Sequence, residues 1–302
     1  MKKIIFNTSD YKYLAQKVLE LGEFEKGELE TNTFSDGERY QRILSQVENR
    51  NVILIGGTVN DSATLELYDL ASALVSYGAN SLSLVVPYFG YSTMERAVAT
   101  GEVVTAKTRA RLLSSIPRSN KGNHIYLFDL HTEGLPHYFE GNLFPIHLYC
   151  KELIIEACRE FGGDDFVLAS TDAGRAKWVE SLANDMHVNA AFVLKRRLQG
   201  DKTEVNAVNA DVEGKNVIIY DDMIRSGGSI INAAKTYKNA GANKIFVITS
   251  HGLFVNNGLE KIKNSNIIEK VICTDTHPNT QLIKDDFLEV RSISRLIVDN
   301  LK

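Results

Sequence analysis

The chain has 302 residues and a formal net charge of −4, with 44% hydrophobic and 24% charged residues. This composition is typical of a soluble globular protein, and the length indicates two domains. The charge gives no electrostatic footprint for nucleic acid, and no apolar run is long enough to cross a membrane. We therefore expect no nucleic-acid or membrane partner. Three cysteines without metal-binding spacing predict buried free thiols of a reducing compartment, so we expect a cytoplasmic protein.

The N-terminal segment predicts a strand, a helix and a hairpin. Residues 3–6 favour a strand, and residues 13–21 favour a helix that ends at Gly22. A Phe-Ser-Asp-Gly-Glu segment at 34–38 predicts a turn before a strand at 40–44. Taken alone, this segment is most simply an Asp-Gly hairpin turn.

An internal repeat organises the rest of the chain. Residues 51–90 and 216–254 both begin with Asn-Val-Ile and run strand, glycine-containing loop, helix, Gly-Ala-Asn, strand. The repeat predicts an α/β fold of two similar domains, each a mainly parallel sheet flanked by helices with right-handed crossovers. We place the domains at 1–145 and 146–302. The first copy has two glycines where the second has two aspartates, so we expect only the second domain to keep this kind of ligand site.

A loop in the second copy has the features of a sugar-phosphate site. A buried strand at 217–220 precedes two aspartates, and a Gly/Ser-rich loop leads into a helical pattern at 230–240 that Gly241 ends. Glycines let backbone N–H groups approach oxygens, and the helix N-terminus adds partial positive charge. An ordinary βα turn is the alternative, but adjacent carboxylates without partners are costly. The candidate residues are Asp221, Asp222, Arg225, Ser226, Gly227, Gly228 and Ser229.

Two other strand ends carry polar side chains. A predicted strand ends at His131, and a second strand, at 166–170, is followed by Thr171 and Asp172. In open α/β sheets, ligands bind at the carboxyl ends of strands. A lone histidine is more often structural, and Asp172 could instead cap the helix that follows.

A dense basic run occupies residues 195–202. It follows a predicted strand at 191–194 and leads into a polar loop that extends to Gly214. Such a run is commonly a solvated face. Cations held in place could equally stabilise the negative charge of a phosphoryl group during transfer.

These motifs, in this order, resemble the ribose-phosphate pyrophosphokinase (phosphoribosyl-pyrophosphate synthetase) family. The family has two phosphoribosyltransferase-type domains with one degenerate sugar site, unlike single-domain phosphoribosyltransferases. Val-Pro-Tyr-Phe-Gly-Tyr at 86–91 and Asp-Leu-His at 129–131 also resemble it, whereas Thr171 stands where the family has proline. Residues 93–97 depart from the basic segment of the best-known class. Glu95-Arg96 and the Gly-Asp-Lys at 200–202 look more like the plant-type class II members, described as phosphate-independent and less selective for the nucleotide.

The resemblance implies Mg²⁺-dependent transfer of pyrophosphate from ATP to the anomeric hydroxyl of ribose 5-phosphate. It implies a nucleotide site shared with a neighbouring subunit, and hence a homo-oligomer that is at least a dimer and commonly a hexamer. The implied residues are Lys195 and Arg197 for catalysis, His131 and Asp172 for magnesium, and Phe34, Asp36, Glu38, Glu95 and Arg96 for the nucleotide.

The acceptor remains open at this point. Arg225 lies where common family members have a neutral or acidic residue, and an extra cation could meet a second phosphate, as in ADP-ribose. Some phage relatives transfer pyrophosphate to ADP-ribose for NAD synthesis. A non-catalytic synthetase-associated subunit is a further alternative, disfavoured because the implied catalytic and metal residues are all present. The amphipathic segment 293–301 predicts a packing or interface helix.

Overall fold

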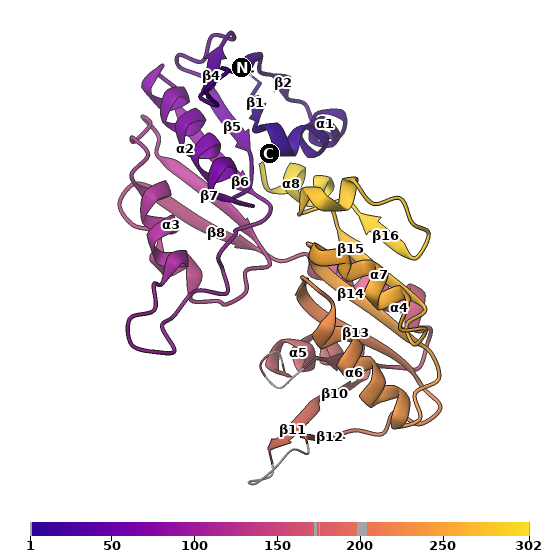
Figure 1. Cartoon of the computed structure of the whole chain (residues 1–302). Coiled ribbons are helices and arrows are strands. Elements are labelled where there is room, and N and C mark those ends of the chain that lie inside the picture. The colour runs from indigo at the N-terminus through magenta and orange to yellow at the C-terminus, as the bar shows by residue number, and fades with distance from the viewer. Residues whose placement is uncertain (1, 172–173, 175, 198–203, 302) are drawn as a thin grey trace. The chain divides into compact units, whose positions relative to one another are not determined.

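The computed structural model describes residues 2–171, 174, 176–197 and 204–301, with backbone only at 194–197 and 204–207. The chain forms two compact units (Figure 1). Unit 1 comprises Met1–Tyr149 and Ser292–Lys302, and unit 2 comprises Cys150–Arg291. Each unit is described by itself below.

Unit 1 is built on a six-stranded parallel sheet with the order β2-β1-β5-β6-β7-β8. A hairpin, β3–β4, forms a separate two-stranded antiparallel sheet. The strands are β1 (Ile4–Asn7), β2 (Glu25–Lys26), β3 (Leu29–Thr33), β4 (Arg39–Ile43), β5 (Asn51–Ile55), β6 (Ser81–Val86), β7 (Asn123–Phe128) and β8 (Leu143–Leu148). The helices are η1 (Ser9–Tyr11), α1 (Lys12–Leu21), α2 (Asp61–Ser76), α3 (Thr105–Ser114), η2 (Leu135–Tyr138) and α8 (Ser294–Leu301).

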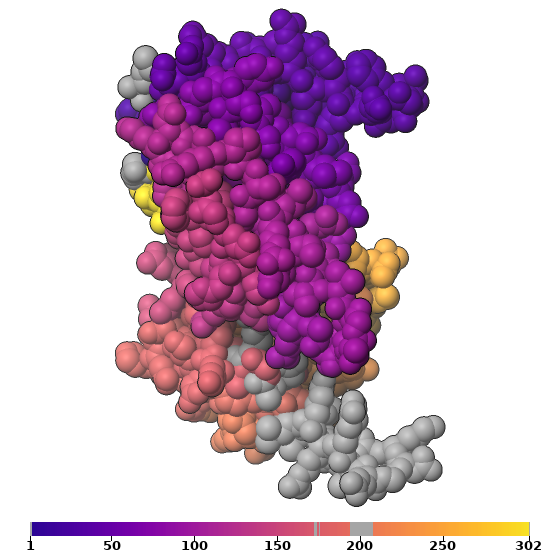
Figure 2. All heavy atoms as spheres, turned by 90° about the vertical axis from the view of Figure 1, so that its left-hand side faces the viewer, coloured from indigo at the N-terminus to yellow at the C-terminus, as the bar shows by residue number. Residues whose placement is uncertain are grey.

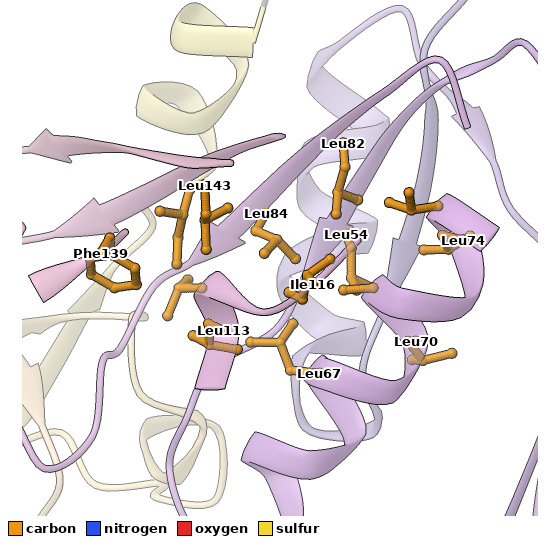
Figure 3. Close-up of a cluster of buried hydrophobic side chains, with 14 of the residues drawn as sticks. Leu54, Leu67, Leu70, Leu74, Leu82, Leu84, Leu113, Ile116, Phe139 and Leu143 are labelled. Atoms are coloured by element: carbon orange, nitrogen blue, oxygen red, sulfur yellow. The ribbon is translucent and has the colours of Figure 1, made fainter. Parts of the chain in front are cut away.

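The core of unit 1 lies between this sheet and the helices α2 and α3. Apolar residues on alternate positions of the strands point to one face, as the two-residue period of a strand requires. Leucines at three- and four-residue spacing on α2 meet them, and burial of this apolar surface is the main stabilising term of the unit. Figure 3 shows the cluster, whose labelled members are Leu54, Leu67, Leu70, Leu74, Leu82, Leu84, Leu113, Ile116, Phe139 and Leu143.

Unit 2 repeats the same topology. Its six-stranded parallel sheet has the order β10-β9-β13-β14-β15-β16, and a hairpin, β11–β12, again forms a separate two-stranded sheet. The strands are β9 (Phe166–Ser170), β10 (Asn189–Ala191), β11 (Val193–Arg197), β12 (Glu204–Val208), β13 (Asn216–Ile224), β14 (Ile245–Gly252), β15 (Lys270–Thr274) and β16 (Leu288–Arg291). The helices are α4 (Lys151–Gly162), α5 (Ala176–Met186), α6 (Gly228–Asn239), η4 (Val255–Asn257), α7 (Gly258–Lys263) and η5 (Pro278–Gln281).

The predicted internal repeat is confirmed, and the similarity extends beyond the repeated segments to the strand order of both whole sheets. The two copies correspond to β5–α2–β6 and β13–α6–β14, which occupy the same places in their sheets. In both sheets the second strand lies on one side of the first and the third strand lies on the other. The chain therefore reverses its direction of winding between the first and third strands, which is the switch point where open α/β sheets bind ligands.

The last helix of each half belongs to the other unit. α4 follows β8 but packs against β13 and β14 of unit 2, whereas α8 follows β16 but packs against α1 of unit 1. The side chains of Ile297, Val298 and Leu301 on α8 are buried. The predicted contiguous domains, 1–145 and 146–302, therefore differ from the compact units, because the C-terminal helix buries its apolar face in unit 1.

Two predicted boundaries in unit 2 are also corrected. The strand expected at 217–220 continues to Ile224, because Met223 and Ile224 pair with His251 and Gly252 of β14. The polar loop expected before Gly214 contains β12, which pairs with β11 from Val193 to Arg197. The sequence of β12 alternates polar and apolar residues from Glu204 to Ala207, which is the two-residue period of a strand.

Two expectations from composition can be compared with the structure. Cys150, Cys158 and Cys273 are free and buried, as predicted. No helix within the described residues has the length and apolar content needed to cross a membrane.

Candidate functional site

The switch point of unit 2 brings together two of the predicted strand ends. β9 and β13 are neighbours in the sheet, with Tyr220 paired to Ser170. Just beyond, the hydroxyl of Thr171 donates a hydrogen bond to Oδ2 of Asp221 at 3.1 Å. The segment after β9 and the aspartate pair of β13 therefore form one site at the carboxyl edge of the sheet.

The two aspartates have different environments. Asp221 is half-buried, whereas Asp222 is buried, with 2% of its surface exposed. The backbone N–H of Asp222 donates to Oδ1 of Asp221 at 3.0 Å, which fixes the Asp221 carboxylate relative to the strand. Carboxylates held in this way present oxygens in defined directions, as recognition of sugar hydroxyls or of a hard cation requires.

Backbone hydrogen bonds and close backbone contacts fix the position of the loop after β13. The carbonyl of Ile224 accepts hydrogen bonds from the N–H groups of Leu253 and Phe254 at 3.0 and 3.1 Å. Gly227 has φ +80°, and a Cβ at that residue would lie 2.7 Å from Cγ1 of Ile262. A Cβ at Gly258 would lie 2.4 Å from the carbonyl oxygen of Arg225. The loop therefore rests directly on the start of α7, and glycine is required at both contacts.

The N-terminus of α6 is suited to an anion. Its N-cap is Gly227, and within the described part of the chain no side chain caps it. Ser226, Gly228 and Ser229 are exposed around this end. The unsatisfied N–H groups of a helix N-terminus and its partial positive charge favour a phosphate at this place.

The corresponding place in unit 1 is closed by its own side chains. The side chain of Asn60 caps α2 by accepting from the N–H of Ala63 at 2.9 Å. A Cβ at Gly57 would lie 2.3 Å from the hydroxyl oxygen of Tyr11, so the tyrosine fills the space beside the loop. The two loops therefore differ in their caps: a side chain caps α2, whereas no side chain within the described residues caps α6.

A buried tyrosine is hydrogen-bonded to the ends of two strands beside the site. The hydroxyl of Tyr237, on α6, donates to the carbonyls of Ser170 and Ala191 at 2.8 and 3.3 Å. Burial raises the pKa of this phenol above its ordinary value, so it remains a neutral donor. The helix that begins at the loop is thus tied to the strand that precedes Thr171.

Sequence reasoning gave no role to a buried polar cluster beside the site. Nδ1 of His251 and Oγ1 of Thr276 are hydrogen-bonded at 2.8 Å, and both residues have no more than 2% of their surface exposed. His277 is also buried, and its Nδ1 accepts from the N–H of Asn279 at 3.2 Å. A repeated sequence motif could have indicated this cluster. Asp-x-His follows the fifth strand of both sheets, at 129–131 and at 275–277.

We expect His277 to make the protein sensitive to acid. Burial and the nearby His251 lower the pKa of His277 to about 3, from an ordinary value of 6.5. Below pH 6.5 the unfolded chain binds a proton at this residue that the folded chain does not bind until about pH 3. The stabilisation is therefore complete above pH 6.5 and is lost as the pH falls towards 3.

The test is the free energy of unfolding at about pH 7 and at about pH 5. His277→Asn keeps a hydrogen-bond acceptor for Asn279 and removes the titration, so this variant is expected to lose less stability between the two values. His187→Asn, at an exposed histidine, is the control. Equal losses in wild type and His277→Asn would contradict the assignment.

The predicted nucleotide loop is the tip of the β3–β4 hairpin. Phe34 is 52% exposed and packs edge-on against Tyr40, with ring centroids 5.9 Å apart. Oδ1 of Asp36 accepts from the N–H of Glu38 at 3.0 Å, and Gly37 adopts φ +94°. The tip is thus an ordered turn with an exposed aromatic ring. Figure 2 shows indigo atoms from the N-terminal part of the chain projecting from unit 1.

The other predicted nucleotide residues lie in the loop before α3. The hydroxyl of Tyr138 donates to the carbonyl of Glu95 at 2.6 Å, which ties the loop to η2. Nε of Arg96 lies 3.4 Å from the Glu95 carboxylate, and the Arg96 side chain is 78% exposed. The structure therefore places an exposed cation on a tethered loop of unit 1.

The remaining predicted residues are only partly described. His131 follows β7 and is half-buried. Asp172 lies outside the described residues, as do 198–203 of the basic run. Lys195 and Arg197 lie on β11, and the description of them extends to the backbone alone. Among the described residues, no cluster of three or more His, Cys, Asp or Glu side chains could hold a metal ion.

Comparison with a solved structure defines the class of fold. The chain matches the crystal structure of phosphoribosylpyrophosphate synthetase from Mycobacterium smegmatis with a TM-score of 0.89 and 24% identity, over 100% of this chain and 98% of that one. The protein therefore has two phosphoribosyltransferase-type domains, each a parallel sheet flanked by helices.

Comparisons of sequence define the family. Residues 3–116 match the model of the N-terminal domain of ribose phosphate pyrophosphokinase, and residues 169–302 match that of the phosphoribosyl synthetase-associated domain. The ribose-phosphate pyrophosphokinase of Thermococcus kodakarensis is 32% identical over 83% of this chain and 86% of its own length. That of Shewanella oneidensis is 32% identical over 94% and 88%. The chain belongs to the ribose-phosphate pyrophosphokinase family and is an enzyme of the pyrophosphokinase type.

Proposed function

We propose that this enzyme transfers a pyrophosphoryl group from ATP to the C1 hydroxyl of ribose 5-phosphate. The sugar oxygen forms a bond to the β-phosphorus, the bond from that phosphorus to the oxygen of the α-phosphate breaks, and AMP leaves. The proton of the hydroxyl is released, and the products are phosphoribosyl pyrophosphate and AMP. The observation that carries the proposal is the open loop at the switch point of unit 2, with its fixed carboxylate beside an uncapped helix N-terminus.

This loop would hold the sugar phosphate. Asp221 and Asp222 would accept hydrogen bonds from the ribose hydroxyls, because the ionised carboxylate is an acceptor only. The backbone and hydroxyl groups of 226–229 would bind the 5′-phosphate at the start of α6. Since Gly227 and Gly258 fix the loop, little order must be gained when the substrate binds.

Charge on the transferring group would be met by cations. Lys195 and Arg197 would stabilise the oxygens of the pyrophosphoryl group, which is the largest electrostatic contribution available without a dedicated base. His131 and Asp172 would help to hold magnesium, together with phosphate oxygens and water, because two side chains alone cannot satisfy a hard octahedral cation. A bound ion would neutralise part of the phosphate charge.

The nucleotide would bind at segments of unit 1. Phe34 offers an exposed ring for stacking on adenine, and Asp36 and Glu38 offer acceptors at the same tip. Glu95 and Arg96 would meet the nucleotide from the loop before α3. We propose that the hairpin tip serves a neighbouring subunit, so that the active enzyme is at least a dimer.

One observation favours a second candidate acceptor. Arg225 is exposed at the start of the sugar-phosphate loop, where its backbone is fixed by Gly258. A cation there could pair with the second phosphate of ADP-ribose, in which case the product would be ADP-ribose pyrophosphate.

Replacement of Arg225 separates the two acceptors. If ADP-ribose is a substrate, Arg225→Ala is expected to lower kcat/KM for ADP-ribose by about tenfold, because a charge-assisted contact is lost, and to change kcat/KM for ribose 5-phosphate less than twofold. Equal losses for both acceptors would count against a role in selecting a diphosphate. Lys235→Ala, at an exposed lysine farther along α6, is the control.

The function itself is tested by AMP formation. Purified enzyme is incubated with ATP and magnesium, with ribose 5-phosphate and ADP-ribose in parallel, and AMP is separated by chromatography. AMP that depends on ribose 5-phosphate and is lost in Lys195→Ala would support the proposal. AMP that depends only on ADP-ribose would favour the second candidate, and AMP with neither acceptor would overturn both.

A further inference from the structure

The β3–β4 hairpin is separate from the six-stranded sheet of unit 1. Its two strands pair only with each other in the described structure, and an isolated two-stranded hairpin is marginally stable in water. Leu29 and Ile43, at its base, pack against the hydrophobic core. The tip with Phe34 is exposed. The direction in which the tip points must therefore be set by contacts along the hairpin.

Open space flanks the hairpin on both sides. On one side a groove of about 840 Å³ separates Leu29 and Thr31 from Lys12 and Gln16 of α1. On the other side a groove of about 750 Å³ lies between the hairpin and the surface of α2 that carries Asp69. Each groove is lined by residues of the hairpin and of a neighbouring helix.

A buried carboxylate connects α2 to the hairpin. Glu66, on α2, has 2% of its surface exposed. Its Oε1 accepts from the N–H and hydroxyl of Ser9 at 3.0 and 2.7 Å, and from Nε2 of Gln41 on β4 at 3.4 Å. Its Oε2 lies 3.9 Å from Nη2 of Arg39, also on β4. One side chain thus connects the hairpin, α2 and η1.

The same end of α2 makes further contacts with both predicted nucleotide segments. Arg39 donates to the hydroxyl and carbonyl of Ser62 at 2.8 and 3.2 Å. Asp61 accepts from Arg109 at 2.6 Å and from the hydroxyl of Tyr91 at 2.8 Å, at the start of the loop that carries Glu95. In unit 2 the corresponding helix, α6, begins where the sugar-phosphate loop ends. In unit 1 this helix end is occupied by bracing contacts.

We propose that Glu66 is a positioning residue for nucleotide binding, which orients the β3–β4 hairpin through Arg39 and Gln41. The inference rests on the proposed function for the role of the hairpin tip. Burial strengthens the contacts of a carboxylate and makes their loss costly, because the partners are left without an acceptor. The charge environment agrees: burial and Glu66 both raise the pKa of Asp10, and Arg39 opposes them.

Glu66→Gln tests the proposal with little change in volume. The KM for ATP is expected to rise about tenfold, because a charged contact to the hairpin is lost, while kcat and the KM for ribose 5-phosphate change less than twofold. Glu30→Gln is the matched control. Glu30 also faces an arginine, Arg42 at 3.9 Å, but this exposed pair lies within the hairpin and does not connect it to α2.

Hydrogen exchange tests the bracing independently of turnover. Amides of 29–43 are expected to exchange faster in Glu66→Gln than in wild type or Glu30→Gln, with the amides of β5 and β6 unchanged. Arg39→Gln is expected to give the same pattern, and the double variant should show less than the sum of the two effects.

Unchanged exchange at 29–43, or faster exchange throughout unit 1, would overturn the proposal. Equal increases in the KM for ATP and for ribose 5-phosphate would do the same. If wild type forms no AMP with either acceptor, the proposed function fails, and the exchange comparison alone decides whether Glu66 orients the hairpin.

Discussion

Asp221→Asn is expected to lower kcat/KM for ribose 5-phosphate by about 100-fold, with the free energy of unfolding changed by less than about 1 kcal/mol. The carboxylate is held by the N–H of Asp222 and the hydroxyl of Thr171, so its two oxygens lie in fixed directions. An amide of the same shape can still accept from the N–H of Asp222, and its NH2 group can donate to the hydroxyl of Thr171, but it loses the charge that strengthens bonds from sugar hydroxyls. The expected 100-fold loss corresponds to about 2.7 kcal/mol, which lies within the range of about 1.5–3 kcal/mol for one hydrogen bond to a charged group.

A second aspartate of unit 2 provides the control. Asp211 is exposed, and its Oδ1 accepts from the N–H of Glu213 at 3.1 Å in a turn before β13. Asp211→Asn removes the same charge from the same unit and is expected to leave kcat/KM within twofold. A similar loss in both variants, or full activity of Asp221→Asn, would contradict the assignment of Asp221 to the sugar.

Gly227→Ala is expected to destabilise unit 2 by about 2–4 kcal/mol and to raise the KM for ribose 5-phosphate. The residue has φ +80°, which costs an alanine about 1–2 kcal/mol, and the added Cβ would lie 2.7 Å from Cγ1 and 2.9 Å from Cδ1 of Ile262. The loop must shift away from α7 to relieve this contact. That shift moves the N–H groups that we propose bind the 5′-phosphate.

The adjacent glycine separates strain from a general effect of substitution in the loop. At Gly228 an added Cβ would meet no described atom within 4 Å, and φ lies outside the left-handed region. Because Gly228 begins α6 and alanine favours helix, Gly228→Ala is expected to be neutral or slightly stabilising. Thermal unfolding and steady-state kinetics of both variants provide the measurement. Equal destabilisation by the two would show that the contact with Ile262 does not fix the loop.

Local patterns in the sequence were sufficient to predict the parts of the site that lie within a few residues of one another. The repeated Asn-Val-Ile and Gly-Ala-Asn segments predicted β5–α2–β6 and β13–α6–β14. The Gly-Gly-Ser loop predicted the start of α6, and the Asp-Gly segment predicted the turn between β3 and β4. These features depend on backbone preferences and on side-chain periodicity, which a single stretch of sequence carries.

Features that depend on distant partners could not be predicted in this way. Aspartates are poor strand formers, yet β13 continues through Asp221 and Asp222 because Met223 and Ile224 pair with β14. The amphipathic pattern of α8 showed a helix with an apolar face but not that this face packs against α1. Glu66 resembles an ordinary polar position on α2. Its role is visible only when Ser9, Arg39 and Gln41 are placed around it.

The duplicated units suggest how one fold supplies two different sites. In unit 2 the loop between β13 and α6 ends at Gly227, the N-cap of α6, which has no side chain to cover the helix N-terminus. In unit 1 the loop between β5 and α2 ends at Asn60, whose side chain caps α2. The next turns of α2 contact the hairpin and the loop before α3. The same helix end therefore contacts segments proposed to bind the nucleotide in unit 1 and begins at the loop proposed to bind the sugar phosphate in unit 2.

The most direct test of the central claim is the phosphorus NMR spectrum of a reaction with ATP, magnesium and ribose 5-phosphate. The account predicts that AMP and a pyrophosphate bonded to the sugar C1 increase together in equal amounts. Formation of ADP with a sugar that carries a single phosphate at C1 beside its 5-phosphate, or of AMP with free pyrophosphate, would contradict transfer of an intact pyrophosphoryl group to C1.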